Sequence, residues 1–206
     1  MKTWYQTVVL PKLLSDGMNS AELKEVRQEV LKDATGVVLE IGVGPGYNIP
    51  LYKNISRLFA LEPSPELMKI AEERSKVQPL SFSVNFLNIP AEKISLPDAS
   101  IDTVVSTWTL CSVKNPQKVL QEIKRVLRPG GKFIFADHGA APTFVVRIAQ
   151  TLFTSVSKYF TGNCHCDRDI EKLIKRAGFT LQKIEYPSED TFRPMIYNYQ
   201  GVAVKK

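Results

Sequence analysis

The 206-residue sequence lacks the features that mark several classes of protein. It has three cysteines, too few for the disulfide framework of a small secreted domain, and a chain of this length folds without such cross-links. It has no apolar run of the roughly 20 residues that cross a bilayer, no repeat and no low-complexity tract. Pro11 and Lys12 interrupt the partly apolar start, and no small-residue cleavage site follows. We therefore predict no signal peptide and expect a cytoplasmic protein.

The overall composition is that of one globular domain spanning residues 1–206. Apolar residues make up 44% of the chain and charged residues 23%. The formal charge of +6 would suit a nucleic-acid or anionic-membrane partner, but the basic residues are scattered along the chain. The densest group, between Lys114 and Lys132, is expected on a solvated helix face. Charge alone names no partner.

The order of elements predicts an α/β fold. From about residue 36 onward, short β-rich runs alternate with helical patterns, which is typical of a parallel sheet flanked by helices. Strands are expected near residues 37–41, 58–61, 82–87, 101–106, 132–136, 180–186 and 196–204. Helices are expected over residues 20–31, from 65, from 116 to a stop at 129–131, over 142–160, and from 167 to 177.

A glycine-rich turn follows the first buried strand. Residues 40–46 spell Glu-Ile-Gly-Val-Gly-Pro-Gly and precede a predicted helix. Glycines let the backbone turn sharply and let a ligand approach it closely, and such a turn lies at the carboxyl end of a parallel sheet, where ligands bind. Glu62 ends the next strand, where a carboxylate can accept hydrogen bonds from both hydroxyls of a ribose. The pattern indicates a nucleoside-containing cofactor.

The spacing of the glycines separates two classes of cofactor. The dinucleotide fingerprint would need a glycine at position 47, which is Tyr47 here. Glu40, just before the glycines, would suit a ligand whose amino-acid tail carries an ammonium group. S-adenosylmethionine is such a ligand. A glycine turn that binds nothing is the plainer alternative.

Four segments in the same order resemble those of the class I S-adenosylmethionine-dependent methyltransferases. Within that family, the chain looks like a bacterial branch related to the methyltransferase-like thiol methyltransferases. The family resemblance rests on residues 40–46, 62–66, 91–92 with 96–98, and 126–131. The narrower resemblance rests on residues 109–113, 137–139, 164–165 with 168–169, and 193–194 before 197–199.

The resemblance implies a fold and a cofactor site. The implied fold is a Rossmann-like, seven-stranded, mostly parallel sheet with helices on both faces and an antiparallel last strand. One departure from the family is Pro90, where many relatives carry an acid that accepts from the adenine amino group. The implied contacts with S-adenosylmethionine are Gly42, Gly44 and Gly46 beside the methionine part, Glu40 near its ammonium, Glu62 on the ribose, Pro63, Leu67, Ala91 and Glu92 around the adenine, and Thr107 at the methyl-donor end.

Methyl transfer from a sulfonium is a direct in-line displacement, so positioning the acceptor and excluding water can supply much of the rate. A base is needed only where the acceptor must lose a proton. Asp137 and His138, just after the fifth strand, are the candidates, with loop capping and structural packing as their alternatives. No metal site is predicted, because Cys-His-Cys at 164–166 does not match zinc-ligand spacing.

Two appended pieces are expected to define the acceptor: an N-terminal helical cap over residues 1–35 and a helical lid or insertion over 140–178. Trp108, Cys164 and His165 are expected to shape its pocket. A small, apolar acceptor is predicted, either a thiol or a lipid-like amine. The alternatives are a nucleic-acid methyltransferase, disfavoured because residues 106–109 lack the Asn/Asp-Pro-Pro-aromatic motif, a non-catalytic cofactor-binding module, and a nicotinamide oxidoreductase.

Two further questions stay open in the sequence. The apolar helix over 142–160 could pack on the core, close over the acceptor or touch a membrane surface. The sequence also contains no pattern that indicates the oligomeric state.

Overall fold

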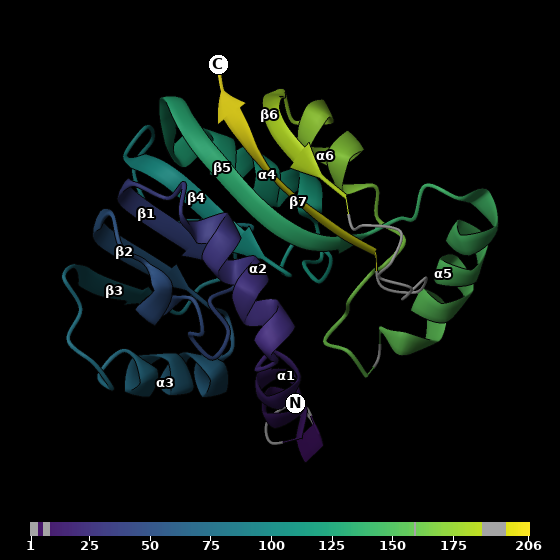
Figure 1. The fold of residues 1–206 in the computed structure, drawn as a ribbon, viewed down its shortest axis with the longest axis horizontal. Helices are drawn as coiled ribbons and strands as arrows, with labels where there is room; N and C mark the ends of the chain where they lie inside the picture. Colours follow the sequence, from purple (N-terminus) through teal and green to yellow (C-terminus); the bar gives the residue numbers. More distant parts are fainter. Residues whose placement is uncertain (1–3, 6–8, 159, 187–196) are drawn as a thin grey trace.

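The central sheet has seven strands in the order β3-β2-β1-β4-β5-β7-β6 in the computed structural model, which describes residues 4–5, 9–158, 160–186 and 197–206 (Figure 1). All neighbouring pairs from β3 to β5 are parallel, whereas β7 runs antiparallel to both β5 and β6. The predicted fold is therefore confirmed. The strands are β1 Gly36–Ile41, β2 Ile55–Leu61, β3 Ser83–Leu87, β4 Ile101–Thr107, β5 Leu127–Gly139, β6 Phe179–Glu185 and β7 Tyr197–Lys205.

Side-chain caps begin most of the helices. Ser20, Ser64, Asn115 and Asp169 each accept a hydrogen bond from the backbone N–H three residues later, which satisfies a donor that the helix itself leaves free. No described helix combines the length and apolarity that a bilayer span requires. The helices are α1 Leu10–Gly17, α2 Ala21–Leu31, α3 Pro65–Arg74, α4 Pro116–Val126, α5 Phe144–Ser157 and α6 Ile170–Arg176.

The sheet buries an apolar cluster on each face, because successive side chains of a strand point to opposite sides. Leu39 of β1 packs with α4 and α6, whereas its neighbour Val38 packs with α2 and α3. Figure 1 shows the same division, with α2 in front of the sheet and α4 and α6 behind it. The central strands are thus covered on both sides, and their carboxyl ends remain available for a site.

Residues 10–17 form α1, inside the predicted N-terminal helical cap, because Pro11 stands in the first turn, where its missing N–H costs nothing. Two local predictions were wrong. A three-residue 3₁₀ helix, Ile49–Leu51, follows the glycine turn instead of an α-helix. The expected stop at 129–131 lies inside β5, since α4 already ends at Val126. Tyr159, residues 193–194 and the predicted strand start at 196 lie outside the described residues.

Helix α5 has its polar side inward. Gln150, Thr154 and Ser157 are buried, and Gln150 bridges the N–H of Ala141 and the carbonyl of Gly139. Core packing of the apolar side, one of the predicted alternatives, is therefore wrong, and the helix stands away from the sheet (Figure 1). The large apolar side chains that α5 exposes are Phe144, Val145, Ile148, Leu152, Phe153 and Val156.

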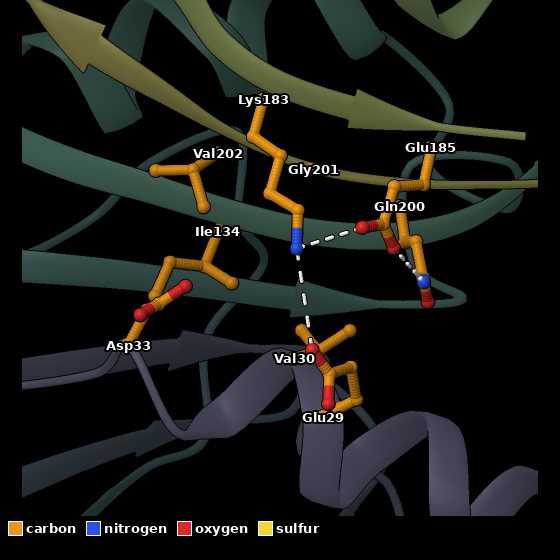
Figure 2. Close-up of a pocket in the computed structure, with 9 residues that line it drawn as sticks. All are labelled: Glu29, Val30, Asp33, Ile134, Lys183, Glu185, Gln200, Gly201 and Val202. Atoms are coloured by element: carbon orange, nitrogen blue, oxygen red, sulfur yellow. Dashed lines mark hydrogen bonds and ion pairs between the residues drawn. The ribbon is translucent and has the colours of Figure 1, made fainter.

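Figure 2 shows a small pocket where α2 meets β6 and β7. Lys183 lies 2.7 Å from Glu185 and 4.0 Å from Glu29 across its mouth. Its volume of about 20 Å³ holds little more than one water molecule, so it is not a ligand site.

Gly46 and Gly130 offer a matched test of this packing, because both have φ near +80° (80° and 75°). A Cβ on Gly46 would lie 2.9 Å from the Cα of Ala71 in α3, whereas a Cβ on Gly130 meets nothing within 4 Å. We expect Gly130→Ala to lower the free energy of unfolding by about 1–2 kcal/mol, the cost of a left-handed alanine. Gly46→Ala should lose about 1–3 kcal/mol more through overpacking. Urea denaturation followed by circular dichroism measures both, and equal losses would contradict this account.

Candidate functional site

A cavity of about 960 Å³ opens at the carboxyl ends of β1, β2 and β4. Its size is at the upper end of the range for small-molecule pockets. Segments from both predicted appendages reach it, through Met18 and Arg27 on one side and Asn163 on the other. Predicted site residues that line it are Glu40, Gly42, Gly44, Glu62, Pro63, Leu67, Ala91, Glu92, Thr107 and Trp108, and Pro90 lines it too.

The three glycines of the turn have different surroundings. Gly42 has φ +64°, and a Cβ there would lie 2.3 Å from the Oγ1 of Thr109. Gly44 has φ +54° and donates its N–H to Oε2 of Glu62 at 3.1 Å. Gly46 is not among the cavity-lining residues and packs against α3 instead. Only the first two glycines therefore bring the backbone to the cavity.

Glu62 is fixed at the end of β2 by backbone donors. Besides the N–H of Gly44, its carboxylate accepts the N–H of Ser64 at 2.9 Å. Its carbonyl oxygen accepts a hydrogen bond from Nδ2 of Asn88 at 2.7 Å. The side chain is buried and borders the cavity. A carboxylate held in this way is pre-positioned for a ligand's hydroxyl groups.

Glu40 anchors a buried polar network at the end of β1. Its two carboxylate oxygens accept from Asn48 Nδ2 and from the Tyr52 hydroxyl, each at 2.8 Å. Asn48 Nδ2 also lies 3.0 Å from the Thr107 Oγ1. The side-chain oxygen of Asn48, Oδ1, is buried and accepts no hydrogen bond from the described protein atoms. Asn48 lines the cavity, so this orphaned acceptor awaits a donor from a ligand there.

Burial raises the pKa of Glu40 to about 7, although the hydrogen bonds from Tyr52 and Asn48 and the charge of Arg27 act in the opposite direction. The carboxyl is thus only partly ionised at neutral pH in the cofactor-free protein. A cationic group placed beside it would favour the ionised form.

Arg27 supplies a buried cation to the same cavity. Only 4% of its surface is exposed, and its guanidinium carbon lies 4.9 Å from the ring centre of Trp108 and 5.4 Å from that of Tyr47. Burial lowers the pKa of this guanidinium. The indole N–H of Trp108 donates to Oδ1 of Asn198 at 3.2 Å, which fixes the ring. Arg27, Tyr47 and Trp108 form a cation–aromatic wall.

The predicted catalytic pair does not border the cavity. The buried carboxylate of Asp137 accepts the backbone N–H groups of Thr109, Leu110 and Cys111 at 3.1, 2.7 and 3.0 Å. Burial raises the pKa of Asp137 to about 6. Asp137 therefore caps the turn after β4, which was the alternative weighed for it.

His138 is not among the cavity-lining residues either. Its Nδ1 lies 3.5 Å from the Sγ of Cys164 and 3.9 Å from that of Cys111. Burial lowers its pKa to about 4. Cys164 faces His138, and the Nδ1 of His165 lies 3.9 Å from Asp167. Neither Cys164 nor His165 is among the lining residues, although the preceding residues 161–163 are.

The comparisons with known proteins agree with this geometry. The family described as "Methyltransferase domain" matches residues 39–135. The human Thiol S-methyltransferase TMT1A is 38% identical over 174 residues, covering 79% of this chain and 69% of the relative. The chain belongs to the class I S-adenosylmethionine-dependent methyltransferases. Its cofactor is accordingly S-adenosylmethionine, and the protein is an enzyme.

A second sequence relative and a solved structure are also similar to this methyltransferase. The phosphatidylethanolamine N-methyltransferase of Cereibacter sphaeroides is 32% identical over 141 residues, covering 67% of each chain. A SAM-dependent methyltransferase from Aquifex aeolicus superposes with a TM-score of 0.68 at 19% identity, covering 95% of this chain and 98% of that one. The human relative is thus named for a thiol acceptor, and the Cereibacter sphaeroides relative for an amine.

The cavity fits the cofactor, which supplies an activated methyl group. The orphaned oxygen of Asn48 and the carboxylate of Glu40 suit an ammonium group, and Glu62 suits ribose hydroxyls. Asn48, Tyr52 and Arg27 were not predicted as site residues. No local motif contains them, and only burial beside Glu40 or Trp108 marks them.

The raised pKa of Glu40 predicts pH-dependent binding. Below about pH 7 the carboxyl takes up a proton and loses the charge that would attract a ligand's ammonium, which itself stays protonated there. We expect the affinity for S-adenosylhomocysteine, which carries the same amino-acid tail, to fall by up to about tenfold per pH unit below pH 7. Isothermal titration calorimetry between about pH 5.5 and 8 measures it.

Two variants control this experiment. Glu40→Gln, which cannot ionise, should flatten the pH profile. Glu62→Gln should weaken binding at every pH by about tenfold or more, through charged hydrogen bonds, and leave the slope unchanged. A wild-type affinity that does not change between pH 8 and pH 6 would exclude this role for Glu40.

Proposed function

We propose that this methyltransferase transfers the methyl group to the sulfur of a small, apolar thiol. The observation that carries the proposal is the charge at the acceptor end of the cavity. There the buried guanidinium of Arg27 lies against Trp108. Among the described lining residues the carboxylates are Glu40, Glu62 and Glu92, all in segments that the family resemblance assigns to the cofactor.

The proposal assigns the cofactor to the following contacts. Asn48 and Glu40 hold the ammonium of the methionine part, beside the backbone of Gly42 and Gly44. Glu62 accepts hydrogen bonds from the ribose, and Thr107 lies at the methyl-donor end. Pro63, Leu67, Pro90, Ala91 and Glu92 surround the adenine.

The charge at the acceptor end distinguishes a thiol from an amine. A thiol must lose its proton before attack, and the resulting thiolate is stabilised by a nearby cation in a buried site. Arg27 is such a cation, so it would lower the pKa of a bound thiol and let its proton pass to solvent. An alkylammonium acceptor would meet a like charge instead, and Glu40, the carboxylate that interacts with Arg27, is assigned here to the cofactor's ammonium. Lipid-like amines are therefore the weaker candidate.

This assignment needs no side-chain base, which agrees with the positions of Asp137 and His138 outside the lining. The acceptor sulfur forms the new bond to the methyl carbon while the bond from that carbon to the cofactor's sulfur breaks. The protein contributes a positioned thiolate, an aromatic wall and a site shielded from water. The segments 1–35 and 140–178 would cover this site as cap and lid.

A panel of acceptors tests the proposal. With labelled cofactor we expect turnover of small alkyl and aryl thiols, and none of phosphatidylethanolamine, primary amines or a short RNA hairpin. Arg27→Met should lower kcat/KM for thiols by about tenfold or more and shift the pH profile of the reaction upward, toward the thiol's own pKa, because one pKa unit corresponds to a tenfold change in thiolate.

Arg27→Lys is the matched control, since it keeps the charge and should retain the pH profile. Calorimetry with S-adenosylhomocysteine checks whether Arg27 serves the cofactor's carboxylate instead. A tenfold loss of cofactor affinity with an unshifted pH profile would contradict the thiolate role. Turnover of amines in preference to thiols, or no turnover at all, would overturn the proposed function.

We also propose that α5 contacts an anionic membrane surface. Its exposed side chains are mostly apolar, and Arg147 is the only charged residue within the helix, with Lys158 at its end. A helix with an apolar outer face and basic charge suits the interface of anionic lipids. The Tyr5 hydroxyl donates to the carbonyl of Phe160 at 3.1 Å, so the N-terminal segment that carries the exposed Trp4 contacts the residues just after α5. Apolar thiols also partition into membranes, so this contact would bring the enzyme to its proposed acceptor.

Vesicle sedimentation measures this contact. We expect the wild-type protein to sediment with phosphatidylglycerol vesicles, and Ile148→Glu with Leu152→Glu to abolish sedimentation while turnover of a water-soluble thiol stays within about twofold, because neither residue lines the cavity. Val77→Glu is the control, since Val77 is 81% exposed and lies away from α5, after α3. Equal loss in this control, or no sedimentation of the wild type, would exclude the contact.

A further inference from the structure

All three cysteines of the chain and one of its two histidines gather at one place. Cys111 comes from the turn after β4, His138 from β5, and Cys164 and Cys166 from the loop between α5 and α6. The two sulfur atoms of Cys111 and Cys164 and Nδ1 of His138 all lie within 4.8 Å of one another. The Sγ of Cys166 lies 3.7 Å from that of Cys164. Neither the cofactor site nor the acceptor wall uses these four side chains.

The separations among Cys111, His138 and Cys164 suit neighbouring ligands of a tetrahedral metal ion. Zinc–sulfur bonds of about 2.3 Å and zinc–nitrogen bonds of about 2.0–2.1 Å place neighbouring ligands about 3.8 Å apart for two sulfurs and about 3.6 Å for sulfur and nitrogen. His138 Nδ1 lies 3.5 Å from Cys164 and 3.9 Å from Cys111. Thiols hydrogen-bond weakly, so hydrogen bonding alone gives four such groups little reason to converge.

The geometry points to a structural site for a thiophilic divalent cation of the zinc class, with Cys111, His138 and Cys164 as ligands and Cys166, whose Sγ lies 3.7 Å from that of Cys164, turning in to complete the set. A Cys₃His set is one of the usual closed, tetrahedral sets for zinc. Each bound cysteine gives up its proton as the metal–sulfur bond forms, and the histidine binds through Nδ1 as the neutral ring. The cysteines are 1%, 9% and 5% exposed, so the site is closed to substrate.

The surroundings hold the ligands in place. Asp137 accepts the N–H of Cys111 at 3.0 Å, and the carbonyl of Cys111 accepts the N–H of His165 at 2.8 Å. Such outer contacts orient metal ligands in proteins. The site would join the loop that carries residues 161–163, part of the cavity wall, to the turn that carries Trp108. The spacing argument of the sequence applied only to residues 164–166, whereas the proposed ligands come from three separate segments.

Metal content and spectroscopy of the intact protein test the inference without any acceptor. We expect the protein, purified with reductant and without chelator, to contain about one equivalent of zinc by mass spectrometry of the metal. Cobalt substitution should give sulfur-to-cobalt charge-transfer absorption and the intense visible bands of a tetrahedral thiolate site. Zinc should also protect the wild-type thiols from a disulfide reagent, and a chelator should expose them. These wild-type measurements do not depend on whether a variant folds.

Variants then assign the ligands. Cys111→Ser and His138→Asn should each lower zinc affinity by about tenfold or more. His165→Asn is the matched control, because His165 adjoins Cys164 and Cys166 in sequence but its ring lies beside Asp167. The inference is overturned if the folded, reduced wild type binds no zinc or cobalt, or if His165→Asn loses as much metal as His138→Asn. A disulfide between two of these cysteines in the freshly purified protein, seen as a loss of two hydrogens in the intact mass, overturns it too.

Discussion

The carboxylate of Asp137 holds the part of the molecule on which the rest of the site depends. By accepting three consecutive backbone N–H groups, it fixes the turn after β4 in a single conformation. That turn carries Trp108 into the cavity with φ +50° and presses Thr109 against Gly42, where a Cβ has no room. It also directs Cys111 toward His138. A buried charge is costly unless hydrogen bonds satisfy it. Any other conformation of the turn would leave this carboxylate without its donors, so its burial favours the one conformation observed.

The cavity separates its charges by task. Carboxylates at the ends of β1 and β2 face the portion where a cofactor with a cationic tail and ribose hydroxyls belongs. The buried cation Arg27 lies against the rings of Tyr47 and Trp108, close enough to Glu40 for the two charges to interact. Because both sets lie in poorly solvated surroundings, each acts strongly on a bound group. The same fold can therefore bind one cofactor throughout a family while the acceptor end varies with the residues supplied by the appended helices.

Local signals in the sequence predicted the sheet, the glycine turn and Glu62, because each depends on residues close together in the chain. Caps such as Ser64 and Asn115 located helix starts for the same reason. Arg27, Asn48 and Tyr52 escaped because their role comes from burial beside residues far away. Helix α5 escaped for another reason: sequence-based predictions assume that the apolar side of a helix packs on the core, whereas α5 buries its polar side. The cluster of Cys111, His138 and Cys164 joins residues 26 and 27 positions apart, which no short motif can show.

The position of β7 has a consequence for how the molecule is made. β6 pairs with β7 and not directly with β5, and β7 follows β6 in the chain. During synthesis β5 therefore waits as an open edge, and β6 has no place in the sheet until β7 arrives between them. Such non-local pairing is slow and leaves edges exposed to wrong partners. Because Asn198 of β7 also fixes the indole of Trp108, the cation–aromatic wall is among the last features to become rigid. A nascent chain could therefore hold Glu40 and Glu62 in place before the ring of Trp108 is fixed.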